Sequence, residues 1–244
     1  MNKPISEARA WEIAREFATE ATSQDVNRYI LGIFMIGSLA AKQYRPGWSD
    51  IDTVIVARNS ISDEFRASLK EMRASYQSQY GIPKGFGGIV LREQDLQPPY
   101  DPEKELVPEI YRLLQQGKPL WGEYDLSDIP TPSRDDFRAY AKVFYTWLRG
   151  LKEPDRERTI VATVNRILIE IRLFIWDRTD DFILNKRELI PTFLETEHGE
   201  YYREALRKVH EYVLGNIQLR DLDSLERLLD DITDLVAEEV NLSA

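Results

Sequence analysis

The chain lacks several residues and segments that define common protein classes. Its 244 residues include no cysteine, which excludes a disulfide framework, a thiolate nucleophile and a zinc–thiolate site. Its two histidines, His198 and His210, are too few for a histidine-rich metal site. No apolar run approaches the length of about 18 residues that a transmembrane helix needs, and the N-terminus does not resemble a signal peptide. We therefore expect a cytoplasmic protein with no membrane partner.

Positive charge is also scarce. The formal net charge is −10 and the pI is about 4.9, which argues against a nucleic-acid partner because clustered lysine and arginine supply most of the affinity for a phosphate backbone. This charge is still compatible with a nucleotide, which needs only one or two local cations and a metal. Hydrophobic residues make up 43% of the chain, enough for a sizeable core, so global disorder is excluded.

The pattern of apolar residues changes near the middle of the chain. In the first half, continuous apolar runs predict strands, and helical spacing predicts helices between them; the strands are expected over 29–36, 51–57 and 86–92, and the helices over 6–22, 62–80 and 103–116. Proline and glycine over 117–133 predict a linker. The second half predicts helices alone, over 134–150, 157–178, 186–196, 199–215 and 221–240. We therefore predict two domains, 1–125 and 126–244.

Residues 37–52 carry the main functional signal. Gly37-Ser38 ends the first predicted strand, and Asp50 and Asp52 open the second after a spacer of eleven residues (39–49). Side chains at i and i+2 of a strand share a face, with Cα atoms about 6.5–7 Å apart, so both carboxylates can converge on one hard cation. A glycine at a strand end lets backbone approach a phosphate, and Ser38 adds a hydroxyl donor. The alternative is an ordinary turn, in which aspartate is common.

This order of strand, Gly-Ser, spacer and Asp-Ile-Asp resembles the polymerase-β-like nucleotidyltransferase superfamily, and is most similar to the aminoglycoside (streptomycin/spectinomycin) adenylyltransferases. Segments 113–122, 160–173 and 179–186 are similar to that family in the same order. The resemblance implies an α+β fold, with a mixed-sheet nucleotidyltransferase domain followed by an all-α helical-bundle domain. It also implies Mg²⁺ held by Asp50 and Asp52, and a nucleoside triphosphate bound by Gly37 and Ser38. Lys42, in the spacer, is a further phosphate candidate.

The family usually carries a third carboxylate on a later strand, which completes the metal site. In this chain the matching strand places Phe86 or Gly87 at that position, while Glu93 and Asp95 lie several residues downstream. The sequence therefore supplies two of the three expected metal ligands.

A general base is not evident either. Asp135 and Asp136 begin a predicted helix and are interpreted as caps. Glu170 interrupts an apolar helix; it is either a substitute carboxylate or a solvated or ion-paired residue. The resemblance implies transfer of a nucleoside monophosphate, AMP from ATP, to a hydroxyl of a small molecule such as an aminoglycoside. The alternatives are a catalytically weak or inactive protein that binds a nucleotide or a partner, and an antitoxin that adenylylates a partner protein.

Overall fold

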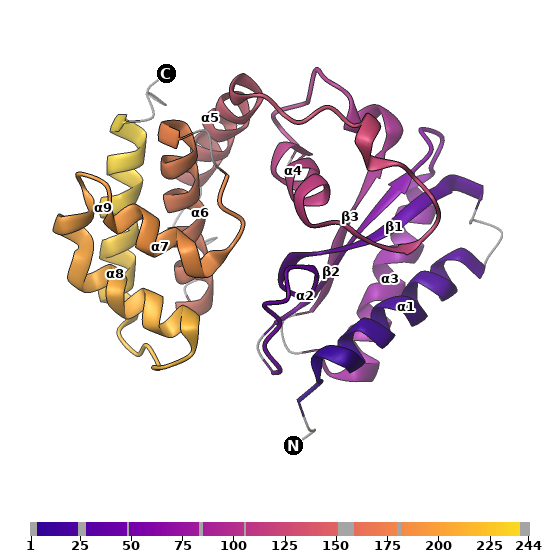
Figure 1. Cartoon of the computed structure of the whole chain (residues 1–244), viewed down its shortest axis with the longest axis horizontal. Coiled ribbons are helices and arrows are strands. Elements are labelled where there is room, and N and C mark those ends of the chain that lie inside the picture. Colours follow the sequence, from indigo (N-terminus) through magenta and orange to yellow (C-terminus); the bar gives the residue numbers. More distant parts are fainter. Residues whose placement is uncertain are drawn as a thin grey trace. The chain divides into compact units, whose positions relative to one another are not determined.

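The computed structural model describes residues 4–23, 28–47, 49–82, 85–104, 106–150, 159–179 and 182–239, with the backbone alone over 145–150. The chain forms two compact units, 1–136 and 137–244. The strands belong to the first unit, and the second is helical throughout its described residues (Figure 1). None of the helices in these ranges combines the length and the apolar character that crossing a bilayer requires.

The first unit is built on a four-stranded mixed sheet of order β3-β2-β1-β4. Its strands are β1 (Ile30–Ile36), β2 (Ile51–Ala57), β3 (Phe86–Arg92) and β4 (Lys118–Trp121). β1 pairs antiparallel with both β2 and β4, and β2 pairs parallel with β3. The three predicted strands are confirmed. The linker predicted over 117–133 is wrong in its first part, because β4 forms there and completes the sheet.

Helices cover the two faces of this sheet. α1 (Glu7–Ser23) and α3 (Asp63–Tyr80) lie together along it in Figure 1. Side chains from both helices form one buried cluster with alternate residues of β2, Ile51 and Ile55. Because successive side chains of a strand point to opposite faces, Asp52 is on the other face. That face belongs to α4 (Leu106–Gln116), which contacts β1 and α2 (Gly37–Ala40).

Local signals in the sequence explain where α3 begins and ends. The Ser62 hydroxyl accepts a hydrogen bond from the backbone N–H of Phe65 at 3.2 Å, which caps the first turn. Gly81 ends the helix with φ 62°, a left-handed conformation that glycine adopts without a steric penalty. The predicted helix is confirmed at both ends.

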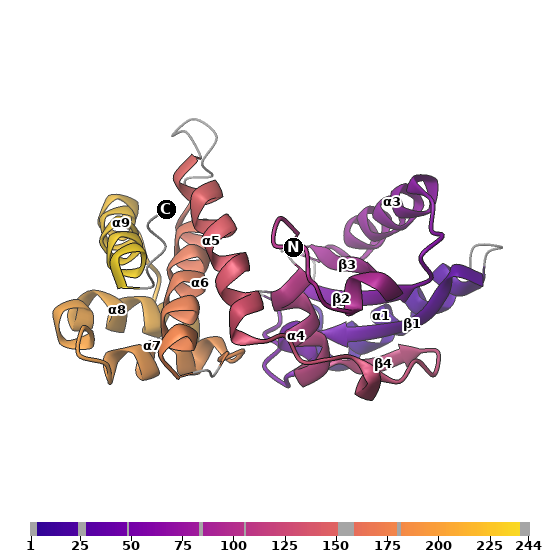
Figure 2. The ribbon, with the colours of Figure 1, turned by 90° about the horizontal axis from the view of Figure 1, so that it is seen from above.

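The second unit is a group of helices in which α6 contacts both α7 and α9, and α7 contacts α8 (Figure 2). Every helix predicted in this half is confirmed over its described residues, and the predicted positions 157–158 and 240 lie outside them. The observed bounds are α5 (Arg134–Gly150), α6 (Ile160–Thr179), α7 (Lys186–Leu194), α8 (Gly199–Leu214) and α9 (Leu222–Glu239). Phe174 and Phe193 are fully buried and pack edge to face, with ring centroids 5.2 Å apart. Along the chain, the division between the two compact units falls between residues 136 and 137, within α5, and the predicted boundary at 125/126 stays a prediction.

Candidate functional site

Asp52 lies between the end of β1 and the beginning of β3. In the sheet register it is opposite Ile36 on one side and opposite Gly87 on the other. Gly37, which follows Ile36, has φ 73°, and a Cβ atom there would lie 2.9 Å from Asp52 Oδ2. A Cβ atom on Gly87 would overlap Asp52 Oδ1. In this conformation the Asp52 carboxylate therefore occupies space that a Cβ atom at position 37 or 87 would need.

The other predicted site residues lie close to this carboxylate in the chain. Asp50 is half-buried and directly precedes β2, two residues before Asp52, a spacing that places two side chains on one side of an extended chain. The Ser38 hydroxyl is buried and has no hydrogen-bond partner among the described residues. Lys42 is exposed, with φ 58°, and no hydrogen bond or ion pair within those residues joins it to either aspartate. The structure thus brings Gly37 against Asp52, with Ser38 and Asp50 as their neighbours in the chain, and among the described residues it shows no contact between Lys42 and either aspartate; the five site residues stay predictions.

Hydrogen bonds fold the spacer back so that Asp50 can enter β2. The N–H of Gln43 donates to the Ser38 carbonyl at 2.8 Å, and the N–H of Ser49 donates to the Arg45 carbonyl at 2.9 Å. Tyr44, between these turns, is buried. Burial and the negative charge of Asp50 raise the pKa of the Tyr44 phenol. The spacer is therefore a packed loop beside the first aspartate.

An arginine that the sequence analysis missed lies beside Asp52. Arg112 Nη2 is 3.7 Å from Asp52 Oδ2, and Arg112 Nη1 is 2.7 Å from Glu109 Oε1. Burial lowers the pKa of Arg112, but the charges of Glu109, Asp52 and Asp50 outweigh it and raise the pKa above its usual value. The guanidinium is thus a permanent cation at the two-aspartate site.

A second arginine supports the strands from the opposite face. Arg73 of α3 donates to the Gly88 carbonyl at 3.0 Å and to the Thr53 hydroxyl at 3.3 Å. Burial lowers the pKa of Arg73 to about 10, and the charge of Asp52 acts in the other direction. Arg73 therefore bridges β2 and β3 and adds positive charge near the Asp52 carboxylate.

The register decides which residue is opposite Asp52 on β3. It is Gly87, and Phe86 instead packs in the cluster beneath α1 and α3. Glu93 follows the last residue of β3 and lies six residues after Gly87, which is about 20 Å along an extended strand at 3.3 Å per residue. Asp95 is occupied by Arg92, which donates to it at 2.8 and 2.9 Å. No third carboxylate accompanies Asp50 and Asp52 within the described residues.

This donor set fits a magnesium ion that is bound together with a nucleotide. No group of three or more histidine, cysteine, aspartate or glutamate side chains in the described ranges could hold a metal by itself. Mg²⁺ in nucleotide sites commonly takes one or two protein carboxylates and completes its coordination with phosphate oxygens and water. Asp50 and Asp52 could supply these carboxylates. The buried Ser38 hydroxyl, which has no hydrogen-bond partner among the described residues, could donate to a phosphate oxygen.

The remaining candidate carboxylates have structural partners. Asp136 accepts hydrogen bonds from the Ser133 N–H at 2.8 Å and from its hydroxyl at 2.6 Å, which confirms it as a helix cap. Glu170 is only 2% exposed, and the Thr233 hydroxyl lies 2.7 and 2.9 Å from its two oxygens. Of the alternatives for Glu170, the solvated residue is therefore wrong, because its carboxyl group is buried in the helical unit; the ion-paired residue and the substitute carboxylate stay predictions.

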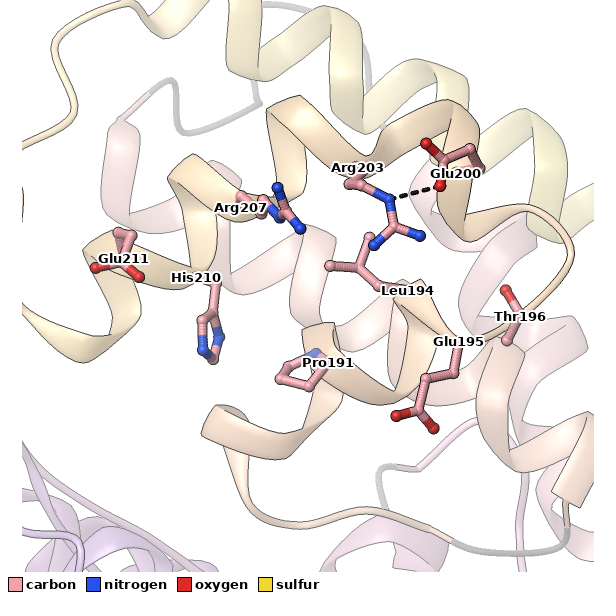
Figure 3. A pocket seen from close by; sticks show the side chains of 9 residues that line it. All are labelled: Pro191, Leu194, Glu195, Thr196, Glu200, Arg203, Arg207, His210 and Glu211. Carbon is pink, nitrogen blue, oxygen red and sulfur yellow. Dashed lines mark hydrogen bonds and ion pairs between the residues drawn. The ribbon is translucent and has the colours of Figure 1, made fainter.

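The helical unit carries a groove of about 830 Å³ between α7 and α8 (Figure 3). It is lined by Pro191, Leu194, Glu195, Thr196, Glu200, Arg203, Arg207, His210 and Glu211. Arg203 is paired with Glu200 at 2.6 Å, and the lining holds three carboxylates, two arginines and a histidine.

Comparison with solved structures supports the fold. Spectinomycin adenyltransferase AAD(9) from Enterococcus faecialis, solved with ATP and spectinomycin, matches 93% of this chain and 99% of its own, with a TM-score of 0.65 and 14% identity. A toxin–antitoxin structure with AMP-PNP matches 55% of this chain and 87% of its own at 14% identity, with a TM-score of 0.30. A tri-AMPylated HEPN toxin with MNT antitoxin from Shewanella oneidensis matches 59% and 88% at 13% identity, with a TM-score of 0.28.

No protein-family model matches the chain, and no curated protein does. The structural likeness to the adenyltransferase extends over nearly the whole of both chains. Together with the strand order and the helical second unit, it confirms the predicted fold class. The chain has the α+β fold of that adenyltransferase, a nucleotidyltransferase-type mixed sheet followed by a helical part.

Proposed function

We propose that the protein is a nucleotidyltransferase that uses ATP and Mg²⁺ and acts in the cytoplasm. The observation that carries this proposal is the pair Asp50 and Asp52 at the entry of β2, next to Gly37 and the unpartnered Ser38 hydroxyl. Two adjacent carboxylates repel each other, and the single positive charge of Arg112 offsets only one of them, so the pair favours a further cation. A hydroxyl buried without a partner costs free energy unless a ligand satisfies it. Both features support a nucleotide–metal site in the proposed domain 1–125.

The proposed reaction transfers AMP to a hydroxyl group. The acceptor oxygen forms a bond to the α-phosphorus of ATP, the bond from that phosphorus to the oxygen bridging the α- and β-phosphates breaks, and pyrophosphate leaves; the hydroxyl proton passes to water. Bound Mg²⁺ would neutralise the phosphates and align the reacting oxygens. Asp50 and Asp52 would hold it, and Ser38 would donate to a phosphate oxygen.

The proposed acceptor is a small molecule such as an aminoglycoside. The structural neighbour was solved with spectinomycin, so spectinomycin and streptomycin are the first acceptors to test. The protein is incubated with α-³²P-labelled ATP, Mg²⁺ and each acceptor, and labelled product is detected by chromatography and mass spectrometry. The Asp52→Asn variant is the matched control, because it keeps the side-chain shape and removes the charge. No labelled product with any acceptor would count against a transferase.

A second candidate function is nucleotide binding with little or no transfer. Gly87 favours it, because this residue occupies the place opposite Asp52 where the family usually has a third carboxylate. In that case calorimetry would detect Mg²⁺-dependent ATP binding that Asp52→Asn weakens, while no acceptor is labelled. The third candidate, an antitoxin that adenylylates a partner protein, predicts a labelled protein band when the chain is co-expressed with its genomic neighbour.

A further inference from the structure

Arg112 lies at the two-aspartate site although it belongs to α4, outside the sequence motif 37–52. It comes from α4, and its guanidinium contacts the carboxylates of Asp52 and Glu109 at 3.7 and 2.7 Å. A Cβ atom on Gly37 would lie 3.5 Å from Arg112 Nη2. The cation therefore lies next to the glycine proposed to face the triphosphate, and next to the aspartate proposed to hold the metal.

The contacts of Arg112 are unequal. The bond to Glu109 is short and lies within one helix, at i and i+3, so it limits the positions that the guanidinium can take. The contact with Asp52 is longer than a hydrogen bond. The guanidinium is thus anchored at Glu109 and only loosely paired with Asp52. It has hydrogen-bond donors left, because a guanidinium carries five.

The position of this cation affects metal and nucleotide in opposite ways. A divalent ion on Asp52 would lie within about 6 Å of the guanidinium, and the repulsion between charges of +2 and +1 at that distance weakens metal binding about tenfold even at the dielectric constant of water. A triphosphate beside Gly37 would instead attract the guanidinium, which forms strong charge-assisted bonds to phosphate oxygens.

We propose that Arg112 is a built-in counter-cation of the two-aspartate site, which neutralises Asp52 in the empty site and passes to the triphosphate when the nucleotide is bound. The inference rests on the proposed function and adds an order of binding to it. The metal alone is disfavoured, and the metal–nucleotide complex is favoured, so the site loads with both together. Glu109 keeps the guanidinium within reach of both partners.

The test compares metal and nucleotide binding in the full-length protein. The variant Arg112→Met keeps the length of the side chain and removes its charge. Binding of Mn²⁺ alone is measured by electron paramagnetic resonance, and binding of ATP with Mg²⁺ by calorimetry. We expect Mn²⁺ affinity to rise about tenfold and ATP affinity to fall about 10- to 100-fold, the loss of one hydrogen bond to a charged group. The control Arg112→Lys, which keeps the charge, should leave Mn²⁺ affinity close to that of the wild type.

The two opposite changes separate this role from a structural one, which would lower both affinities. Equal Mn²⁺ binding by the wild type and Arg112→Met, including none by either, would overturn the inference, as would unchanged ATP binding. If the wild type binds no ATP, both this inference and the proposed function fail. If the wild type binds ATP and Arg112→Met binds Mn²⁺ and ATP as the wild type does, the inference fails and the proposed function stands. If Arg112→Met does not fold, Arg112→Gln replaces it, because its amide can still donate to Glu109.

Discussion

Replacing Gly87 with aspartate is expected to build a three-carboxylate metal site. Gly87 is opposite Asp52 in the parallel pair β2–β3, so both residues face the same side of the sheet. Gly87 has no positive φ, and its backbone therefore accepts an L-residue. A side chain added there points at Asp52 Oδ1, and the Asp52 carboxylate must turn aside to admit it.

The magnitude follows from the charges. Two carboxylates 4 Å apart repel by about 4 kcal/mol at an effective dielectric constant of 20, and the Arg112 guanidinium offsets part of this. We therefore expect Gly87→Asp to lose about 1–4 kcal/mol in free energy of unfolding without metal. A divalent ion at 100 times its dissociation constant restores about 2.7 kcal/mol, which corresponds to a rise of roughly 10 °C in Tm.

Thermal unfolding with and without Mn²⁺ measures this effect. The matched control is Gly87→Asn, which has the same shape and no charge. Without metal, Gly87→Asp should melt below Gly87→Asn; with Mn²⁺, the order should reverse. A second control is Gly88→Ala: Gly88 has φ 143° and its Cβ would overlap the Thr53 carbonyl oxygen, so its stability loss should not depend on metal.

The same variant tests the chemistry. If the missing carboxylate limits transfer, Gly87→Asp should label the acceptor faster than the wild type, by up to about 10²–10⁴-fold if the new group also assists proton transfer. A three-carboxylate site is ruled out if Mn²⁺ raises the Tm of Gly87→Asp no more than that of Gly87→Asn. Position 87 and Asp52 would then not share a metal site.

Three further predictions concern single side chains. Ser38→Ala should weaken ATP binding in calorimetry about 2- to 10-fold through one lost hydrogen bond, while its free energy of unfolding in urea stays the same or rises, because the substitution removes a buried hydroxyl that has no partner among the described residues; a loss of stability would contradict this. Gly37→Ala should lose about 1–2 kcal/mol in the same assay from its positive φ, and more from the contact with Asp52; a neutral result would argue against a left-handed backbone at this position. Burial raises the pKa of Asp95, but hydrogen bonds from Arg92 outweigh it and lower the pKa below 3.8; its stabilisation is therefore complete above pH 3.8 and is lost as the pH falls further. Asp95→Asn should cost about 1.5–3 kcal/mol at pH 7, a difference that urea titrations at several pH values should see shrink in acid.

The central strands could be predicted from the sequence because their limits are sharp. β2 begins after Asp50 and ends before Arg58-Asn59, and every residue between except Asp52 and Thr53 is apolar. β4 could not be predicted in the same way. Lys-Pro-Leu-Trp contains a proline, which only an edge strand tolerates, and its stabilisation comes from pairing with β1 far back in the chain.

The site residues that lie within the short motif 37–52 could be predicted from the sequence. Those that come from distant parts of the chain, and approach the motif only in the folded structure, could not. The motif residues identify the aspartates, but the choice between Phe86 and Gly87 depends on the strand register. Glu109 and Arg112 have a spacing that suggests a helical ion pair, yet nothing in their spacing says that this side of α4 faces Asp52. Long-range packing decides both points.

The pairing of β4 with β1 also sets the order in which the sheet can be completed during synthesis. β2 follows β1 closely, whereas β4 begins about 80 residues after β1 ends. At about 5–20 residues per second on the ribosome, one edge of β1 has no partner for roughly 4–16 s. That strand reads Ile-Leu-Gly-Ile-Phe-Met-Ile, and an uncovered apolar edge recruits strands from other chains. A nascent or truncated chain that stops before Lys118 is thus exposed to aggregation from which the completed sheet is protected.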